Sequence, residues 1–140
     1  MLTGKYKNNL NESGRICIPS KMRDVFGNGL VITKSPLDKC LVIYPMERWV
    51  EFSAKIKELP HAKSKPLRRI VFGNATDVEF DIKGRFIIPV ELREYAELGG
   101  EVVIMGLEDC AEIWNPVSLE AQEAKDNDED MDKLLNDLGF

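Results

Sequence analysis

The chain has 140 residues, enough for one ordinary domain or for two small units that share a core. Its 44% hydrophobic and 31% charged residues are typical of a soluble globular protein, and no apolar run approaches the roughly 18–20 residues of a membrane span. The net charge of −5 argues at first against a nucleic-acid partner, because proteins that bind polyanions are usually basic.

The first part of the chain predicts a short strand, a tight turn, a second strand and a short helix. The turn spans Asn11–Gly14, and its glycine supplies the positive φ of a tight hairpin. Pro19 ends the second strand and suits the first turn of a helix that closes near Gly27. Two more strands and a longer helix follow. We expect these elements at residues 6–10, 15–18, 20–26, 30–33, 40–44 and 45–59.

The longer helix has an apolar stripe at helical spacing, which is typical of a face packed on a core. Its members are Met46, Trp49, Val50, Ser53 and Ile56. The aromatic residues Tyr44, Trp49 and Trp114 are expected to be core or subunit-interface anchors rather than a ligand cage.

The same order of elements is predicted again after a linker. Pro60 ends the long helix, and a linker helix is expected over 65–72. The second unit turns at Asp81–Gly84, and Asn115 caps its last helix, which has Pro116 at its first position. The acid-rich stretch 126–132 is expected to be a solvated or disordered spacer. The remaining elements are expected at residues 77–80, 85–88, 90–98 (closing near Gly99), 101–105, 111–114 and 131–138.

The two units are copies of one another. A shift of 70 residues aligns identical residues without a gap, and a single unit of this size buries too little surface to be stable alone. We therefore predict a duplication in which the units complete one core by pairing their hairpins. The expected segments are a first repeat with its helix (1–59), a linker helix (60–72), a second repeat with its helix (73–125) and an acidic tail (126–140). The identical pairs include Gly14/Gly84, Arg15/Arg85, Ile18/Ile88, Pro19/Pro89, Arg23/Arg93 and Cys40/Cys110.

Charge is distributed very unevenly along the chain. Residues 1–70 carry fourteen bases and six acids, residues 71–116 carry three bases and ten acids, and residues 117–140 carry two bases and eight acids. The basic first half can face DNA, or it can face the acidic half of a neighbouring copy in a head-to-tail assembly. The two readings are compatible.

Nothing in the sequence predicts an enzyme, a cofactor or a metal site. The cysteines (Cys17, Cys40 and Cys110) form no CxxC pair, and His61 stands alone, so we expect reduced, buried thiols. Neither a GxxxxGK[ST] phosphate loop nor a GxGxxG fingerprint is present. The first residues lack a secretory signal, which favours a cytoplasmic location.

Two arginines, Arg15 and Arg85, directly follow the predicted turns, where a β-ribbon can enter a major groove. The arginine fork matches two acceptors on one guanine edge. Alternatively, each arginine braces its own turn against Asn11 or Asp81, and the spacing alone does not decide. Further candidates for phosphate contacts, each with solvated surface charge as its alternative, are Lys5, Lys7, Lys21 and Arg23. For Arg23 and its counterpart Arg93, a structural salt bridge is a further alternative.

The segments Asn11-Glu-Ser-Gly-Arg15-Ile-Cys-Ile-Pro19 and Asp81-Ile-Lys-Gly-Arg85-Phe-Ile-Ile-Pro89, with helices between and after them, resemble the MraZ family. The resemblance covers residues 1–116. It implies an α+β fold, mainly β with short helices, of two tandem AbrB/SpoVT-like swapped-hairpin units in a double-lobed barrel. Asn11 departs from the family's usual aspartate. It can still cap the turn but cannot form a full ion pair with Arg15.

The resemblance also implies a function. Members are sequence-specific transcriptional regulators of the division and cell-wall gene cluster, including their own gene, and we expect a nucleoid-associated repressor. Their subunits form homo-oligomeric rings on double-stranded DNA with short, regularly spaced promoter repeats. The arginines of the family's DxxxR pattern fall on Arg15 and Arg85, which favours DNA contact over bracing alone. Arg15 is favoured over Arg85, because acids surround the second arginine. The alternative is a ring-forming scaffold or partner-binding protein without DNA readout, which the acidic total keeps open.

Overall fold

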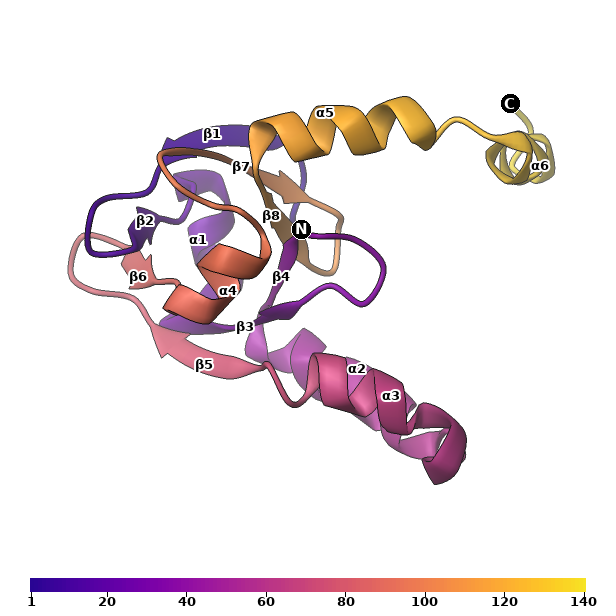
Figure 1. The fold of residues 1–140 in the computed structure, drawn as a ribbon, viewed down its shortest axis with the longest axis horizontal. Helices are drawn as coiled ribbons and strands as arrows, with labels where there is room; N and C mark the ends of the chain where they lie inside the picture. Colours follow the sequence, from indigo (N-terminus) through magenta and orange to yellow (C-terminus); the bar gives the residue numbers. More distant parts are fainter.

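The computed structural model describes residues 1–140 and is an α+β arrangement of eight strands and six helices (Figure 1). The strands are β1 (Lys5–Asn9), β2 (Arg15–Cys17), β3 (Gly29–Lys34), β4 (Leu41–Tyr44), β5 (Thr76–Glu79), β6 (Arg85–Ile87), β7 (Glu101–Gly106) and β8 (Ala111–Trp114). The helices are α1 (Ser20–Phe26), α2 (Met46–Glu58), α3 (His61–Val71), α4 (Val90–Tyr95), α5 (Pro116–Lys125) and α6 (Glu129–Asp137). The order β1, β2, α1, β3, β4, α2 recurs as β5, β6, α4, β7, β8, α5, which confirms the predicted duplication.

Each repeat contributes its first strand to the sheet of the other repeat. The main sheet is antiparallel, in the order β1-β7-β8-β4-β3-β5. β1 pairs with β7, with Tyr6 opposite Ile104, and β5 pairs with β3, with Val78 opposite Leu30. β2 and β6 form a separate two-stranded ribbon that joins the repeats. This reciprocal exchange confirms the swapped arrangement, although β1 and β5 remain free edges and the hydrogen-bonded sheet does not close into a barrel.

One core serves both repeats. It is a single cluster of 18 buried residues, drawn from equivalent positions of the two copies. Ile16 and Phe86 lie opposite each other on the inner face of the ribbon, each 1% exposed. Burying a side chain of this size contributes about 1.5–3 kcal/mol. Neither repeat keeps that contribution without the other, so the chain folds as one unit.

The predicted hairpins differ from the observed ones in one respect. The turn itself is tight, since the Asn11 N–H donates to the Arg15 carbonyl at 2.9 Å and the Gly14 N–H donates to the Asn11 carbonyl at 3.0 Å. Beyond the turn, however, β1 and β2 do not pair with each other. β1 joins the main sheet and β2 joins the ribbon, because each finds its partner in the other repeat.

Three helix boundaries also differ from the expected ones. α4 ends at Tyr95 rather than at residue 98, because Glu97 takes the positive φ (55°) that ends the helical path before Gly99. α3 begins at His61 and continues through Pro66. The acid-rich spacer is short, because Asp128 accepts a hydrogen bond from the Met131 N–H at 3.0 Å and begins α6 there.

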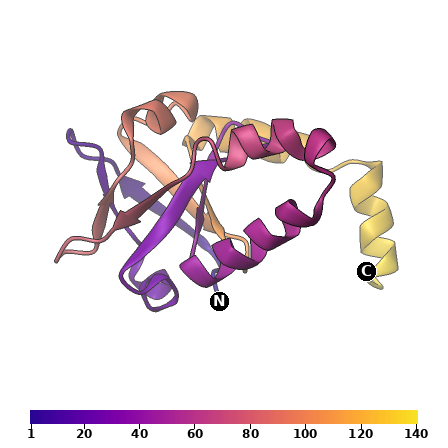
Figure 2. The same ribbon diagram turned by 90° about the horizontal axis from the view of Figure 1, so that it is seen from below.

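The buried stripe of α2 is rotated from the predicted one. Ser53 and Ile56 are buried, as expected, but Met46 is 51% exposed and Val50 is 60% exposed. Phe52 takes the inner place instead and stacks on Tyr44 at a ring-centroid distance of 5.1 Å. Figure 2 shows α2 and α3 projecting from the sheet as a pair joined at their outer end.

The thiols are free, but they are not all buried. Cys40 is buried and Cys110 is partly buried, whereas Cys17 is exposed. The reason is the alternation of β2, which turns Ile16 inward and Cys17 outward. None of the helices combines the length and apolar character that crossing a membrane requires.

Candidate nucleic-acid interface

The β2–β6 ribbon brings Arg15 and Arg85 to one outer face. In its register Arg15 lies opposite Ile87, and Arg85 lies opposite Cys17. Side chains alternate along a strand, so these four residues point away from the core while the residues between them point inward. Arg15 and Arg85 are therefore diagonal neighbours, about 7–8 Å apart at the backbone. The ribbon lies at the end of the molecule away from α2, α3 and α6 (Figure 1).

The second turn holds Arg85 through Asp81. One carboxylate oxygen of Asp81 accepts the backbone N–H groups of Lys83 and Arg85, both at 2.9 Å. The other oxygen accepts the Arg85 Nε–H at 2.9 Å. The backbone hydrogen bond from Arg85, followed by its side-chain bond and charge, lowers the pKa of Asp81 below its usual range. Only Nε of the guanidinium is engaged in this way, so both terminal nitrogens remain available to a ligand.

The first turn keeps the cap and lacks the ion pair. Asn11 Oδ1 accepts the Arg15 backbone N–H at 2.8 Å, the counterpart of the bond at Asp81. The Arg15 guanidinium makes no ion pair and no hydrogen bond within the chain. Asn11, which stands where the second turn has Asp81, therefore keeps the turn intact and leaves the Arg15 side chain unrestrained.

Each turn is also packed against an arginine from the other repeat. A Cβ atom on Gly84 would collide with the Arg23 guanidinium, and one on Gly14 would lie 2.6 Å from Cζ of Arg93. Both glycines have positive φ, 81° at Gly14 and 77° at Gly84. Neither Arg23 nor Arg93 forms a salt bridge, which was one of the roles considered from the sequence. They cover the turn glycines instead.

The turns are joined to the opposite strands by backbone bonds as well. The Ile18 N–H donates to the Gly84 carbonyl at 3.1 Å, and the Ile88 N–H donates to the Gly14 carbonyl at 2.9 Å. Arg93 Nε–H also donates to the Ile88 carbonyl at 2.9 Å. The two repeats have an arginine at the same position, Arg23 and Arg93, and this identity was the signal for the reciprocal brace in the sequence. It did not show the direction in which the two side chains point.

The candidate phosphate contacts fall into two groups. Lys5 is paired with Glu123 of α5, with Nζ 2.6 Å from Oε2, and Arg23 covers Gly84. Lys7 and Lys21 are exposed and form no ion pair in the chain. Asn8 Nδ2 donates to the Cys17 carbonyl at 2.7 Å, which ties β1 to β2, while the Lys7 side chain lies on the other face of β1, the face of Lys5.

The two sides of the ribbon differ in charge. By the 70-residue shift, Lys7 of β1 corresponds to Asp77 of β5, and both side chains are exposed. Glu79 is exposed on β5 as well, and a polar pocket between Arg23, Glu79 and Asp81 adjoins the second turn. An anion is therefore favoured near the first turn and disfavoured near the second.

A second cluster, Asp38, Cys40 and Glu112, has the residue types of a metal site. Its ligand atoms lie within 4.8 Å of one another, which their positions in the sequence did not reveal. Burial raises the pKa of the Cys40 thiol, so the thiolate that a metal requires is disfavoured. Glu112 accepts the Trp114 Nε1–H at 2.8 Å, and burial raises its pKa too. The cluster fits a protonated, hydrogen-bonded network better than a cation.

Comparison with known proteins gives one family. The model of the antitoxin-like MraZ protein family matches the chain twice, over residues 1–68 and 71–138. A protein of Halothermothrix orenii named "Transcriptional regulator MraZ" is 40% identical over 144 residues, which cover 100% of both chains. Proteins of the same name from Moorella thermoacetica and Pediococcus pentosaceus are 41% identical over 117 residues and 37% identical over 144 residues. The first of these two alignments covers 82% of this chain and 81% of the relative, and the second covers all of both.

Proposed function

Because the chain belongs to the MraZ family, we propose that it is a transcriptional regulator that binds double-stranded DNA through the outer face of the β2–β6 ribbon. The observation that carries this proposal is the pairing of β2 with β6, which sets Arg15 and Arg85 side by side on one exposed surface. A two-stranded ribbon fits the major groove, and its outward side chains meet the base edges there.

The two arginines have different parts in this binding. Arg15 has a free guanidinium and lies beside a basic strand, so it reads a guanine edge through two parallel hydrogen bonds. Arg85 offers its terminal nitrogens from a fixed position, because Asp81 holds Nε. Bracing and base contact, which the sequence left as alternatives, are compatible at Arg85.

Phosphate contacts come from the exposed bases near the ribbon. Lys7 and Lys21 meet the backbone directly, since neither is engaged by another side chain. Lys5 contributes only after it exchanges Glu123 for a phosphate, and Arg23 acts mainly by supporting the second turn.

The protein acts as a homo-oligomer, which we propose to be a ring. The strands β1 and β5 are free edges, and the basic first half of one copy complements the acidic second half of the next. Such a head-to-tail contact gives a ring when its rotation closes. One short ribbon binds weakly, and several linked ribbons on regularly spaced DNA repeats gain affinity from their connection.

The regulated genes follow from the family resemblance. We propose that the protein represses the division and cell-wall gene cluster that includes its own gene, and that it is associated with the nucleoid. The proposal is tested with purified protein and DNA from directly upstream of its own gene, beside a scrambled DNA of equal length. Specific binding that falls with salt, with a slope of about −0.9 per phosphate neutralised, supports the proposal.

The second candidate function is a ring-forming scaffold or partner-binding protein without DNA readout. The observation that favours it is the net charge of −5 together with the eight acids of residues 117–140. Equal affinity for native and scrambled DNA, measured with protein shown to be folded and oligomeric, would contradict the regulator proposal and support the scaffold function.

A further inference from the structure

Helix α6 has an apolar face without a buried residue, although Met131 and Leu135 are only 36% exposed. No residue of Glu129–Asp137 is buried, and the exposed fraction of Leu134 is 63%. At 100° per residue, four apolar side chains share one face of the helix. A nine-residue helix is marginal in water on its own and gains stability mainly by burying such a face. The four side chains are Met131, Leu134, Leu135 and Leu138.

Acidic residues border this face on both sides. Asp130 and Asp137 lie along one border and Asp132 lies along the other, at the same helical spacing. α6 holds four acids and one base in all. A complementary surface therefore needs an apolar centre with basic borders.

Helix α3 has such a surface on its outer side. Ser64 and Val71 are its buried residues, and they define the side that packs on the body. The opposite side exposes Ala62, Pro66 and Ile70, which follow one another at intervals of four and so form one stripe.

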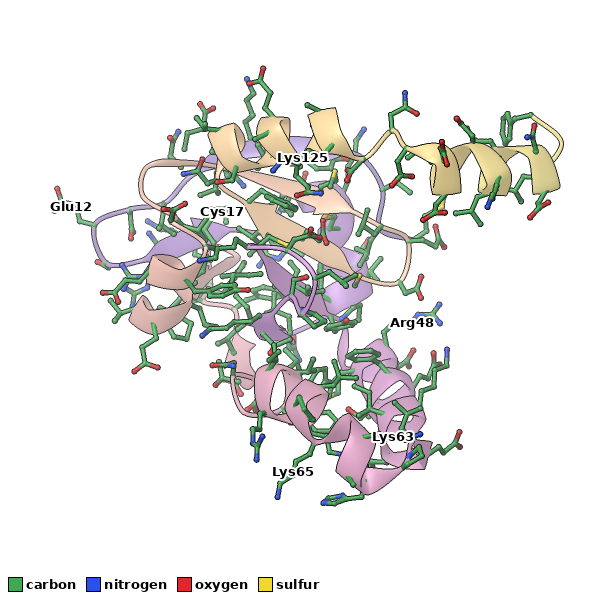
Figure 3. All side chains as sticks on the ribbon, turned by 45° about the vertical axis from the view of Figure 1, so that its right-hand side comes forward. Glu12, Cys17, Arg48, Lys63, Lys65 and Lys125 are labelled. Atoms are coloured by element: carbon green, nitrogen blue, oxygen red, sulfur yellow. The ribbon has the colours of Figure 1, made fainter.

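The stripe on α3 is bordered by bases. Lys65 and Arg69 lie along one border and Lys63 along the other, and the helix contains no acid. Figure 3 shows Lys63 and Lys65 at the outer end of the α2–α3 pair, away from the sheet. An exposed apolar stripe on a basic helix fits an acidic amphipathic helix better than it fits DNA, because phosphates gain nothing from the apolar centre.

The α3 surface is held in position by its own contacts. Thr33 Oγ1–H donates to the Val71 carbonyl at 2.6 Å, which fixes the end of α3 to β3. Arg68 Nη2–H donates to the Ile56 carbonyl at 3.4 Å, which fixes α3 to α2. The surface therefore needs no rearrangement to receive a helix.

We propose that α6 of one copy docks on α3 of a second copy. Three residues, Asp126–Asp128, separate α5 from α6, and they reach at most about 10 Å. α5 lies along the opposite side of the body from the α2–α3 pair (Figure 1), so α6 meets α3 of another copy rather than its own. The contact joins two apolar stripes, and opposite charges along both borders fix its register.

The direct test is disulfide crosslinking between two full-length variants that carry tags of different size. Both have Cys17→Ser, which removes the exposed native thiol. One also has Ile70→Cys and the other has Leu138→Cys. The control replaces Leu138→Cys by Leu37→Cys, because Leu37 is 90% exposed in the loop between β3 and β4.

The expected result is a crosslinked pair of unequal tags from the Ile70→Cys and Leu138→Cys mixture and little from the control mixture. Lys65→Glu with Arg69→Glu lowers the yield about tenfold, and Asp130→Lys with Asp137→Lys in the other copy restores it. Crosslinking of the Ile70→Cys and Leu138→Cys mixture that is no greater than that of the control mixture overturns the proposal.

Discussion

Substituting Gly84→Ala tests the reciprocal brace at the second turn. The position has φ of 77°, and the added methyl group falls on the Arg23 guanidinium. Positive φ costs an alanine about 1–2 kcal/mol. The methyl group displaces only the end of the flexible Arg23 side chain, at a cost of about 0.5–1.5 kcal/mol for the strained rotamer. We therefore expect the free energy of unfolding to fall by about 1.5–3.5 kcal/mol.

The matched control is Gly100→Ala. Gly100 has a similar φ of 82°, but no atom lies within 4 Å of the added methyl group. Only the backbone strain remains there, so its cost stays at about 1–2 kcal/mol. Adding Arg23→Ala to Gly84→Ala removes the crowding, so the two substitutions are less than additive.

The assay is urea unfolding followed by tryptophan fluorescence, at one fixed protomer concentration because assembly contributes to stability. The reasoning is refuted if Gly84→Ala costs no more than Gly100→Ala, or if its effect simply adds to that of Arg23→Ala.

Three further predictions concern the thiols, the first turn and the pH dependence of stability. Promoter DNA should slow alkylation of Cys17, which lies between the ribbon arginines, while Cys110 stays slow throughout because burial raises its pKa to about 11. Mass spectrometry of the alkylated protein checks this, and equal Cys17 rates with and without DNA would place the DNA elsewhere. Asn11→Asp should restore the missing ion pair with Arg15 and raise the free energy of unfolding by about 0.2–1 kcal/mol, an increase that high salt removes. Burial raises the pKa of Glu112 above its ordinary 4.5, so the folded chain keeps a proton that the unfolded chain loses. The contribution of Glu112 to stability is therefore greatest below that ordinary value and falls as pH rises through the raised one. Glu112→Gln, which still accepts from the indole, should flatten the fall in pH-dependent urea melts.

Much of the fold follows from local sequence signals. Gly14, Pro19 and their counterparts mark turns and helix starts by their backbone restrictions alone, which hold wherever the segment lies. The 70-residue repeat predicts that the two units complete one core by pairing their hairpins, because one repeat lacks the surface for a core of its own. The exchange of strands was implied only by the family resemblance.

What the sequence did not reveal depends on contacts between distant residues. Met46 and Val50 fit the helical stripe of α2, yet both are exposed and Phe52 packs on Tyr44 instead, because the stripe's position is set by where α2 packs. Arg93 covers Gly14 across the exchange of repeats, and no local pattern gives the direction of a long side chain.

The candidate site could be predicted from the sequence only in part, because part of its geometry also depends on contacts between distant residues. The turn residues Asn11 and Asp81 act on the next strand four residues away, so their hydrogen bonds could be expected from spacing. The diagonal placement of Arg15 and Arg85 could not, because it depends on the register of β2 against β6. Lys5 looked like a free base until the structure brought Glu123 of α5 to it.

The most direct test of DNA readout by the ribbon compares Arg15→Ala with Arg48→Ala. Arg48 is an exposed arginine on α2, and Figure 3 shows it far from Cys17 of the ribbon. We measure affinity for native and scrambled upstream DNA at one salt concentration, with assembly checked by light scattering. Arg15→Ala should lower native affinity by about fivefold to 150-fold for each guanine that is no longer read, and scrambled affinity much less. Unchanged native affinity in Arg15→Ala, or an equal decrease in Arg48→Ala, would contradict the assignment.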